Sequence, residues 1–242
     1  MLREGWDVKT VVDRFYEQEE HEDEKIFHNT SDLADVQWFL QQARETGDPF
    51  WLIKAYTAET GFYKTVNLAL ARDVHTFRGL YWRALLGPFS LAACFAGHEK
   101  LKKYRFLGTS YRGMKLSLGD FEEHYKVGIE ILIKAFTSTS KLRDIAEQFA
   151  IAPSCESRSL SVLCIYINTD KCWGYNDDGD YAKKKRQPFA LDISSISEYP
   201  HEEEVLILPH TSFVIERIEH LPSGLVEIEL HSNDEYCDSY SG

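Results

Sequence analysis

The sequence predicts an α+β fold in which a helical lobe comes first and a β-rich lobe follows. Before about residue 100, apolar residues recur at steps of three and four, which is the period of an amphipathic helix. Beyond that point, short runs rich in β-branched and aromatic residues are separated by turn residues, as in strands. These runs outnumber the helical segments among them, so a doubly wound sheet, in which strands and helices alternate, is not expected.

Four helical segments are expected in the first lobe, and their ends carry the usual signals. Ser31 is placed to cap the first segment, and Gly47 is placed to end it. Asp48-Pro49 begins the second segment, and Thr60 is placed to cap the third. The four segments are 31–47, 48–56, 60–70 and 77–95, the last one broken at Pro88.

The first thirty residues are strongly charged, and Glu17 to Lys25 is almost continuously so. A segment of this kind is ordinarily a solvated helix or a loose tail. We therefore divide the chain into a charged N-terminal segment at residues 1–30, a helical lobe at 31–100 and a β-rich core at 101–235.

Seven β-rich runs are expected to be the strands of the second lobe. They are Tyr104 to Tyr111, Ile129 to Phe136, Leu160 to Ile167, Pro188 to Leu191, Val205 to Leu208, Phe213 to Ile218 and Leu225 to Leu230. Two helices are expected among them. One is Leu118 to Lys126, which Ser117 is placed to cap, and the other is Leu142 to Phe149.

Three consecutive glutamates stand directly before the apolar run that begins at Val205. If that run is a buried strand, side chains alternate between its faces, so Glu202 and Glu204 point the same way and Glu203 points outward. Two carboxylates in one small site suit chemistry at a sugar bond, where one stabilises an oxocarbenium-like centre and the other handles a proton. The alternative interpretation is a solvated acidic turn before a strand.

Two further motifs precede the glutamates. Residues 109–114 read Thr-Ser-Tyr-Arg-Gly-Met, and residues 136–140 read Phe-Thr-Ser-Thr-Ser. The resulting order, Arg112, then Ser138-Thr139-Ser140, then Glu202-x-Glu204, resembles the arginine-serine-glutamate signature of the cholera-toxin-like ADP-ribosyltransferases. The surrounding residues are similar to those of the eukaryotic arginine-specific mono-ADP-ribosyltransferases. The similarity covers roughly residues 35 to 230 and includes Tyr56-Thr57, Gly61, Tyr63, Asn67, Leu70 through Arg72, Tyr199-Pro200, Pro209 and Phe213.

This resemblance implies the ADP-ribosyltransferase fold, with two small sheets packed at a steep angle, a cleft for NAD between them and the helical lobe at their flank. NAD is implied as a co-substrate, and no metal is implied. The chain contains neither Gly-x-Gly-x-x-Gly nor a P-loop motif, so the usual dinucleotide-binding and P-loop folds are not indicated. Asp177, Asp178 and Asp180 lack the spacing of a calcium loop, so we expect them to face solvent.

The resemblance also implies roles for the first two motifs. Arg112 is implied to hold the NAD phosphate through its planar guanidinium, and the backbone of Gly113 to meet the nicotinamide amide. Ser138 is implied to position the catalytic glutamate, with Thr139 beside it in the NAD site. Ser140 is the residue of this triplet that we expect to cap the following helix.

The roles implied for the third motif separate its two glutamates. Glu204 is implied to contact the ribose 2′-hydroxyl and to stabilise the cationic sugar as nicotinamide leaves. Glu202 is implied to mark arginine as the acceptor and to orient its guanidinium. Tyr199 and His201 are candidates for contact with the acceptor. The loop from Phe149 to Arg158 is expected to cover the phosphate and nicotinamide, with no single residue assigned.

The leading functional hypothesis is therefore transfer of ADP-ribose from NAD to arginine side chains of proteins, with release of nicotinamide. An NAD glycohydrolase on the same scaffold is the alternative enzyme, since water could replace arginine as the nucleophile. A third hypothesis is a binding module with a decayed site, which the intact motifs disfavour.

Composition limits the partners. Lysine and arginine number 27 against 39 aspartates and glutamates, so the formal charge of −12 disfavours a nucleic-acid partner and favours basic acceptors such as arginine-rich proteins. Lys183 to Arg186 is the only basic run, and we expect it to be a solvated loop. The chain as given shows no apolar stretch typical of a signal peptide or a membrane span. We therefore expect a cytoplasmic monomer without a membrane partner, or a chain trimmed from a secreted form.

The cysteines number five and include no Cys-x-x-Cys pair, so neither a zinc site nor a full disulfide framework is indicated. Reduced thiols are the simpler interpretation. Asn29-Thr30-Ser31 is an N-glycosylation sequon that matters only if the protein is exported.

Overall fold

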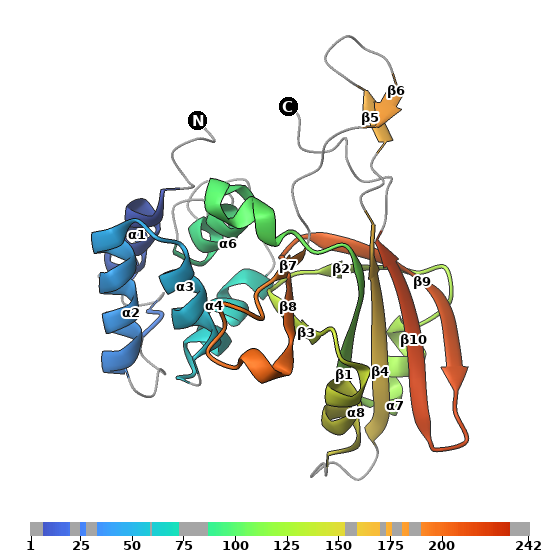
Figure 1. Cartoon of the computed structure of the whole chain (residues 1–242). Coiled ribbons are helices and arrows are strands. Elements are labelled where there is room, and N and C mark those ends of the chain that lie inside the picture. The colour runs from blue at the N-terminus through green and yellow to red at the C-terminus, as the bar shows by residue number, and fades with distance from the viewer. Residues whose placement is uncertain are drawn as a thin grey trace.

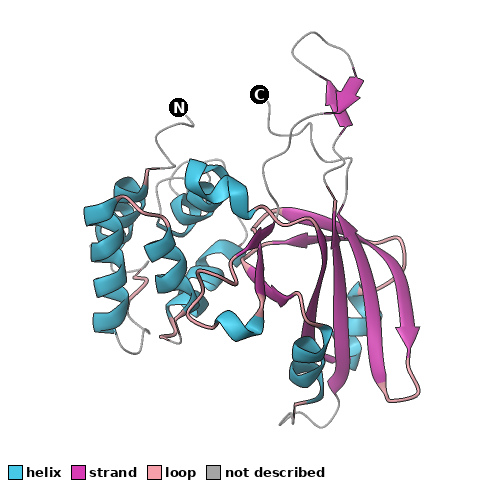
Figure 2. Cartoon of the chain, viewed as in Figure 1, coloured by secondary structure: helices cyan, strands magenta, loops and turns pink. Residues whose placement is uncertain are grey.

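The structure is a computed structural model, and it describes residues 7–19, 25–27, 33–58, 60–72, 87–152, 159–169, 173–175, 181–183 and 190–232. A helical lobe built from the first part of the chain lies beside a β-rich lobe built from the second (Figure 1). Figure 2 shows that the helices of the first part of the chain gather on one side, while the strands lie on the other side together with further helices. The α+β class predicted from the sequence is confirmed.

The helices of the first lobe largely follow the expected boundaries. They are α1 (Val8–Glu19), α2 (Leu33–Thr46), α3 (Phe50–Thr57), α4 (Phe62–Ala71), α6 (Gly87–Gly97) and the short 3₁₀ helix η3 (Glu99–Tyr104). Helix α2 ends at the predicted glycine: Gly47 has φ 63°, and its N–H donates to the Ala43 carbonyl at 2.9 Å. The N-cap of α4 is Gly61 rather than Thr60. The Ser31 cap, the sequon and residues 77–86 lie outside the described residues.

Helix α1 corrects the expectation of a solvated or loose N-terminal segment. Val8, Val11, Val12 and Phe15 are buried in the core of the helical lobe, where α1 packs against α2 and α6. Their spacing of i, i+3, i+4 and i+7 is that of an apolar helix face. The sequence analysis of residues 1–30 rested on their high mean charge. Mean composition does not show on which face of a helix the apolar residues lie, so this apolar face was not predicted.

The second lobe contains the strands. They are β1 (Gly108–Ser117), β2 (Glu130–Ile133), β3 (Thr137–Ser140), β4 (Ser159–Asn168), β5 (Trp173–Tyr175), β6 (Tyr181–Lys183), β7 (Ala190–Asp192), β8 (Glu204–Ile207), β9 (Thr211–His220) and β10 (Leu225–Ser232). Eight of them form one hydrogen-bonded sheet in the order β2-β9-β10-β4-β1-β3-β8-β7, while β5 pairs with β6. Helix α7 (Leu118–His124) follows β1, and α8 (Arg143–Ile151) follows β3. The predicted Ser117 cap of α7 is confirmed, because its Oγ accepts from Asp120 N–H at 3.0 Å.

Two strand predictions were wrong in their boundaries. The first strand begins at Gly108 and not at Tyr104, because it pairs along its whole length with β4; Arg112 therefore lies in the middle of β1 and not at its end. The run from Ile129 to Phe136 forms only one strand, β2, and a second strand that was not predicted, β3, begins directly after it at Thr137. Strand β2 pairs with β9 and β3 with β8, far apart in the sheet. An apolar pattern cannot reveal where one strand ends and the next begins with a different partner. Residues 188 and 189 of a further predicted strand lie outside the described residues.

The eight-stranded sheet divides naturally into the two parts that the family resemblance implied. Strands β1 and β3 are joined through one registered pair, Tyr111 with Ser140, and this narrow link separates β2-β9-β10-β4-β1 from β3-β8-β7. Strand β8 is buried on both faces. Val205 and Ile207 lie in the core between the two parts, and Leu206 lies in the core of the helical lobe. This explains why the sequence of β8 is apolar without alternation.

Helix α8 lies directly on β1, and the contact depends on a glycine. A Cβ placed on Gly113 would come 1.8 Å from the carbonyl oxygen of Ala146 and 2.5 Å from the backbone nitrogen of Ala150. Leu163 and Ile165 of β4 complete the apolar surface under the helix. Helix packing alone thus requires a glycine at position 113, and contact of its backbone with the nicotinamide amide stays a prediction.

We expect Gly113→Ala to lower the free energy of unfolding by roughly 1–3 kcal/mol or more, since the new methyl group meets backbone atoms that cannot rotate away. Chemical denaturation measures the loss. Gly119→Ala is the matched control: its Cβ would have 3.9 Å to its nearest neighbour, Ser117 Oγ, and helix α7 should be unchanged or stabilised. Equal stability of the two variants would contradict the packing role of Gly113.

Candidate active site

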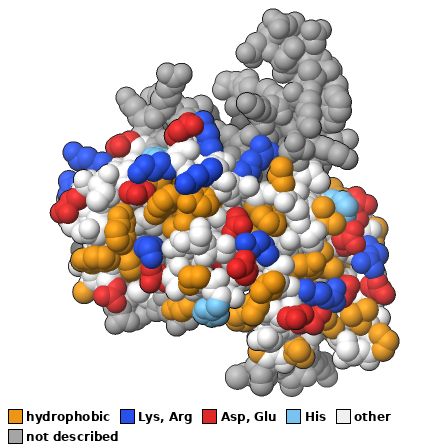
Figure 3. Space-filling view, in the orientation of Figure 1, with side chains coloured by type: hydrophobic (Ala, Val, Ile, Leu, Met, Phe, Trp, Pro, Cys, Tyr) orange, Lys and Arg blue, Asp and Glu red, His pale blue; other side chains and the backbone are white. Residues whose placement is uncertain are grey.

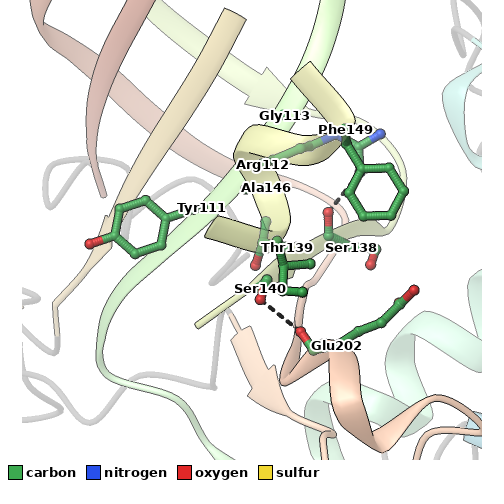
Figure 4. A pocket seen from close by; sticks show the side chains of 10 residues that line it. Tyr111, Arg112, Gly113, Ser138, Thr139, Ser140, Ala146, Phe149 and Glu202 are labelled. Atoms are coloured by element: carbon green, nitrogen blue, oxygen red, sulfur yellow. Dashed lines mark hydrogen bonds between the residues drawn. The ribbon is translucent and has the colours of Figure 1, made fainter. Parts of the chain in front are cut away.

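The three sequence motifs meet at one cavity of about 230 Å³. Its wall comprises Tyr111, Arg112, Gly113, Ser138, Thr139, Ser140, Ile145, Ala146, Phe149 and Glu202. Strands β1 and β3, helix α8 and the turn before β8 each contribute to this wall (Figure 4). The structure therefore brings together residues that are 90 positions apart in the chain, from Arg112 to Glu202.

Arg112 is held at the cavity by the backbone of the second motif. Its Nη1 donates a hydrogen bond to the Ser138 carbonyl oxygen at 2.7 Å. Figure 4 shows its side chain beside Ser138 and Phe149, whereas Tyr111 points away from them. A guanidinium carries five N–H donors in a fixed planar fork, and a diphosphate offers oxygens that match such a fork.

Thr139 and Ser140 use their hydroxyl groups to organise the backbone. Thr139 Oγ1 donates to the Val205 carbonyl oxygen at 2.7 Å, which assigns this buried hydroxyl a structural role. Ser140 Oγ donates to the Glu202 carbonyl oxygen at 2.7 Å and accepts from Leu142 N–H at 2.9 Å. The expected capping role of Ser140 is corrected, since the N-cap of α8 is Leu142. Ser140 instead joins the end of β3 to the turn that carries Glu202.

Glu204 is the first residue of β8, and 6% of its surface is exposed. The strand register pairs Ser138 with Leu206 and Ser140 with Glu204, so Ser138 and Glu204 are diagonal neighbours on one face. Burial raises the pKa of the Glu204 carboxyl, hydrogen bonds from Ser138 and Ser197 oppose that rise, and the nearby charge of Glu202 adds to it. Glu204 does not itself line the cavity. It is connected to the cavity through Ser138, which lines the cavity and is hydrogen-bonded to the Glu204 carboxyl.

Glu202 lines the cavity, but not for the reason that strand alternation predicted. It ends the 3₁₀ turn η4 (Pro200–Glu202), and Glu203 follows in the left-handed region at φ 49°. This turn, and not a strand, directs Glu202 toward the site. Glu203 is half-exposed, as its expected outward position requires, yet it also forms a 2.6 Å ion pair with Lys141.

Tyr199 and His201 lie on the same turn but outside the cavity wall. Their rings are 6.1 Å apart in an edge-on arrangement, and His201 is exposed. Contact with an acceptor molecule stays a prediction for both residues.

Two site residues were missed in the sequence. Ser197 is buried, and its Oγ donates to Glu204 Oε2 at 3.0 Å and accepts from Tyr199 N–H at 3.2 Å. Its only signal was its place among the serines that precede the glutamates.

Tyr56 is buried in the helical lobe, where Asn67 Nδ2 donates to its hydroxyl at 3.0 Å. Burial raises its pKa, and the charges of Glu204 and Arg112 act on it in opposite directions.

The predicted covering loop is corrected at its start. Phe149 belongs to helix α8, lines the cavity and is 57% exposed, so it presents an aromatic ring to the site from a helix. Residues 153–158 of that loop lie outside the described residues, as do Asp177, Asp178, Asp180 and residues 184–186 of the basic run.

The described part of the chain shows no group of three or more histidine, cysteine, aspartate or glutamate side chains that could hold a metal ion. Cys94 and Cys164, which are described, are buried and not in a disulfide, and burial raises the pKa of each thiol to about 12. Cys155, Cys172 and Cys237 lie outside the described residues. Among the described helices, none has the length and apolar character needed to cross a membrane.

Comparison with known proteins identifies the fold. No family model matches the chain. A Vibrio splendidus protein named NAD(+)–arginine ADP-ribosyltransferase Vis is 36% identical over 125 residues, which are 50% of this chain and 41% of that protein. The chain thus matches less than half the length of this curated relative.

Solved structures match most of the chain. Vis bound to the M6 inhibitor has a TM-score of 0.52 at 21% identity, over 93% of this chain and 84% of that one. Vis bound to agmatine has a TM-score of 0.50 at 21% identity, over 84% and 86%. Exoenzyme S of Pseudomonas aeruginosa, bound to carba-NAD, has a TM-score of 0.52 at 16% identity, over 92% and 87%. The chain has the ADP-ribosyltransferase fold, and the resemblance that its motifs indicated is confirmed.

The site geometry predicts how the pKa of Glu204 responds to its neighbours. Ser197→Ala removes a donor to the ionised carboxylate, so the pKa should rise further. Glu202→Gln removes a nearby negative charge, so the pKa should fall. Carbon-13 NMR titration of the glutamate carboxyls measures both shifts. An unchanged Glu204 pKa in Glu202→Gln would show that the two carboxyls do not interact.

Proposed function

We propose that this protein is an NAD-dependent mono-ADP-ribosyltransferase that transfers ADP-ribose from NAD to arginine side chains of proteins and releases nicotinamide. One observation carries the proposal: Arg112, Ser138 and Glu202 line one cavity, and Ser138 is hydrogen-bonded to Glu204, in a chain with the ADP-ribosyltransferase fold. The curated relative is named an NAD(+)–arginine ADP-ribosyltransferase, which supports the same activity here.

The donor groups at the cavity fit NAD. The Arg112 guanidinium suits the diphosphate, because its N–H groups can engage two phosphate oxygens at once. The exposed ring of Phe149 suits stacking against a flat heterocycle such as nicotinamide. The carba-NAD bound to exoenzyme S supports a nicotinamide dinucleotide as the ligand of this fold.

Glu204 would act on the sugar. As the bond between ribose C1′ and nicotinamide breaks, the bonding electrons leave with nicotinamide and positive charge develops on the ribose. An ionised carboxylate that is already oriented by Ser138 and Ser197 stabilises this charge without having to reorganise. Its burial strengthens the interaction, because little water screens it.

Glu202 would act on the acceptor. An arginine nitrogen forms the new bond to C1′. A free guanidinium stays protonated at any relevant pH, so it loses its proton only as that bond forms. Glu202 lines the cavity, where its carboxylate can orient the guanidinium and accept this proton. The agmatine bound to Vis supports a guanidinium compound as acceptor.

An NAD glycohydrolase is the second candidate. Water in place of arginine needs the same Arg112, Ser138 and Glu204, so these residues do not separate the two reactions. Glu202 at the cavity favours transfer, because hydrolysis has no guanidinium to orient.

We further propose basic proteins as acceptors, given the formal charge of −12, and a monomer as the active form. Figure 3 shows charged side chains of both signs interspersed on one face of the molecule.

The test is incubation with NAD and agmatine, followed by mass analysis of the products. ADP-ribosyl-agmatine together with nicotinamide supports the transferase. Free ADP-ribose and nicotinamide without the agmatine adduct would instead identify the glycohydrolase, and an unchanged pool of NAD would refute both.

Glu204→Gln should reduce both transfer and NAD hydrolysis by a factor on the order of 10² or more, because a neutral amide does not stabilise positive charge on the sugar. Nicotinamide release, assayed on protein whose melting temperature matches the wild type, measures the loss. Near-normal release from such a folded variant would remove Glu204 from the mechanism.

Glu202→Gln should separate the two reactions. Transfer to agmatine should be lost, while NAD hydrolysis continues because Arg112, Ser138 and Glu204 are unchanged. Nicotinamide and ADP-ribosyl-agmatine are measured in the same reaction. Equal loss of both products would place Glu202 in NAD cleavage, and retention of both would leave the acceptor role without support.

A further inference from the structure

The segment from 193 to 203 is a loop that leaves β7 and returns to the neighbouring strand β8. Its ends are held close together, since Asp192 pairs with Val205 and Ile193 N–H donates to the Glu204 carbonyl oxygen at 3.0 Å. Ser197 and Glu202, which contact the catalytic carboxyl and the cavity, both lie on this loop. The part that carries Ser197 is anchored separately, because Ile193 and Ile196 are buried in the core of the helical lobe and Glu198 pairs with Lys54 of α3. A contact that fixes the Glu202 end of the loop therefore fixes the acceptor side of the site.

Lys141 contacts both ends of this loop. At the start of the loop, its Nζ lies 2.8 Å from Asp192 Oδ2 and 3.1 Å from Ser194 Oγ. At the other end, the same Nζ lies 2.6 Å from Glu203 Oε2, and the Lys141 backbone N–H donates to the Glu203 carbonyl oxygen at 3.0 Å. One side chain thus joins the start of the loop, at Asp192 and Ser194, to its last residue, Glu203.

The contact at Glu203 holds an unfavourable backbone. Glu203 has φ 49°, in the left-handed region that residues with a Cβ avoid unless their surroundings hold them there. This conformation separates the η4 turn from β8, so it sets the direction of Glu202 relative to Glu204. Lys141 binds both the backbone and the side chain of the residue that adopts it.

The network is shielded enough to hold its geometry. The side chains of Lys141, Asp192 and Glu203 are 27%, 33% and 42% exposed, so each is partly removed from water. Burial raises the pKa of Asp192, but hydrogen bonds from Lys141 and Ser194 outweigh that effect and lower it. One ammonium shared by two carboxylates and a hydroxyl is more constrained than an isolated surface pair.

We propose that Lys141 is a positioning residue that closes the 193–203 loop and so holds Glu202 in register with the acceptor. The proposal rests on the proposed transferase function. Lys141 is absent from the cavity wall, so it acts through Glu203 and the loop and not by contact with NAD. It follows that losing Lys141 should affect arginine transfer more than NAD cleavage.

The test is Lys141→Met, assayed for nicotinamide and ADP-ribosyl-agmatine in one reaction. We expect the yield of adduct per nicotinamide to fall about tenfold or more, because small displacements of a positioning group are costly, while nicotinamide release stays within about threefold. Lys141→Arg, which keeps a cation for both carboxylates, should restore most of the ratio. Lys102→Met is the matched control, since its Nζ also pairs with a carboxylate at 2.6 Å, on Glu99, but lies in η3.

An unchanged ratio in Lys141→Met would overturn the proposal, and so would an equal loss of both products, which indicates a merely structural role. Glu203→Gln provides a second variant if Lys141→Met does not fold: it weakens one end of the loop closure and should lower the ratio in the same direction. An unchanged ratio in a folded Glu203→Gln would also overturn the proposal.

Amide hydrogen exchange separates this proposal from the proposed function. In Lys141→Met, amides of residues 201–203 should exchange faster than in the wild type, while Lys102→Met should match the wild type. If the wild-type protein releases no nicotinamide, the proposed function fails, and faster exchange still supports the loop closure. Unchanged exchange overturns it in either case.

Discussion

The structure around the site depends on one buried carboxylate. Glu204 begins a strand whose two faces are covered by different cores, the helical lobe on one side and the larger part of the sheet on the other. A carboxylate in such a place loses hydration, and its ionised form persists only where donors replace the lost water. Ser138 and Ser197 supply those donors from two separate segments. Strand β3 and the part of the 193–203 loop that carries Ser197 must therefore both be in place to orient the Glu204 carboxyl.

The helical lobe contributes to the site and does not merely flank it. Its core includes Leu191, Ile193, Ile196 and Leu206, so the β7 and β8 strands and the loop between them pack directly on the helices. Lys54 of α3 pairs with Glu198 of the loop at 2.5 Å. Tyr56, on the same helix, lies near enough to Glu204 for the carboxylate charge to affect its pKa. The helical lobe thus excludes water from Glu204. It also holds the 193–203 loop through the buried side chains of Ile193 and Ile196 and the Lys54–Glu198 ion pair.

The boundaries of the elements show where sequence patterns lose their information. Helix α2 was predicted almost to the residue, because its end at Gly47 is a local signal. Strand β1 was misplaced, and β3 was not predicted as a strand separate from β2, because strand limits are set by partners elsewhere in the chain. The apolar face of α1 was overlooked for a different reason, since its charged neighbours dominated the composition.

The sequence by itself indicated the three motifs that meet at the cavity, but not Ser197 or Tyr56. The order of Arg112, the serine motif and the two glutamates indicated the fold and its chemistry, because these side chains are needed whatever their exact placement. Only the tertiary structure decided how they are arranged. Glu202 faces the cavity through a turn that is left-handed at Glu203, and contacts from Lys141 and Ser140 hold that turn. Gly113 likewise reflects the approach of α8. Contacts between segments about sixty residues apart leave no local pattern, so no periodicity or spacing in the sequence could have revealed them.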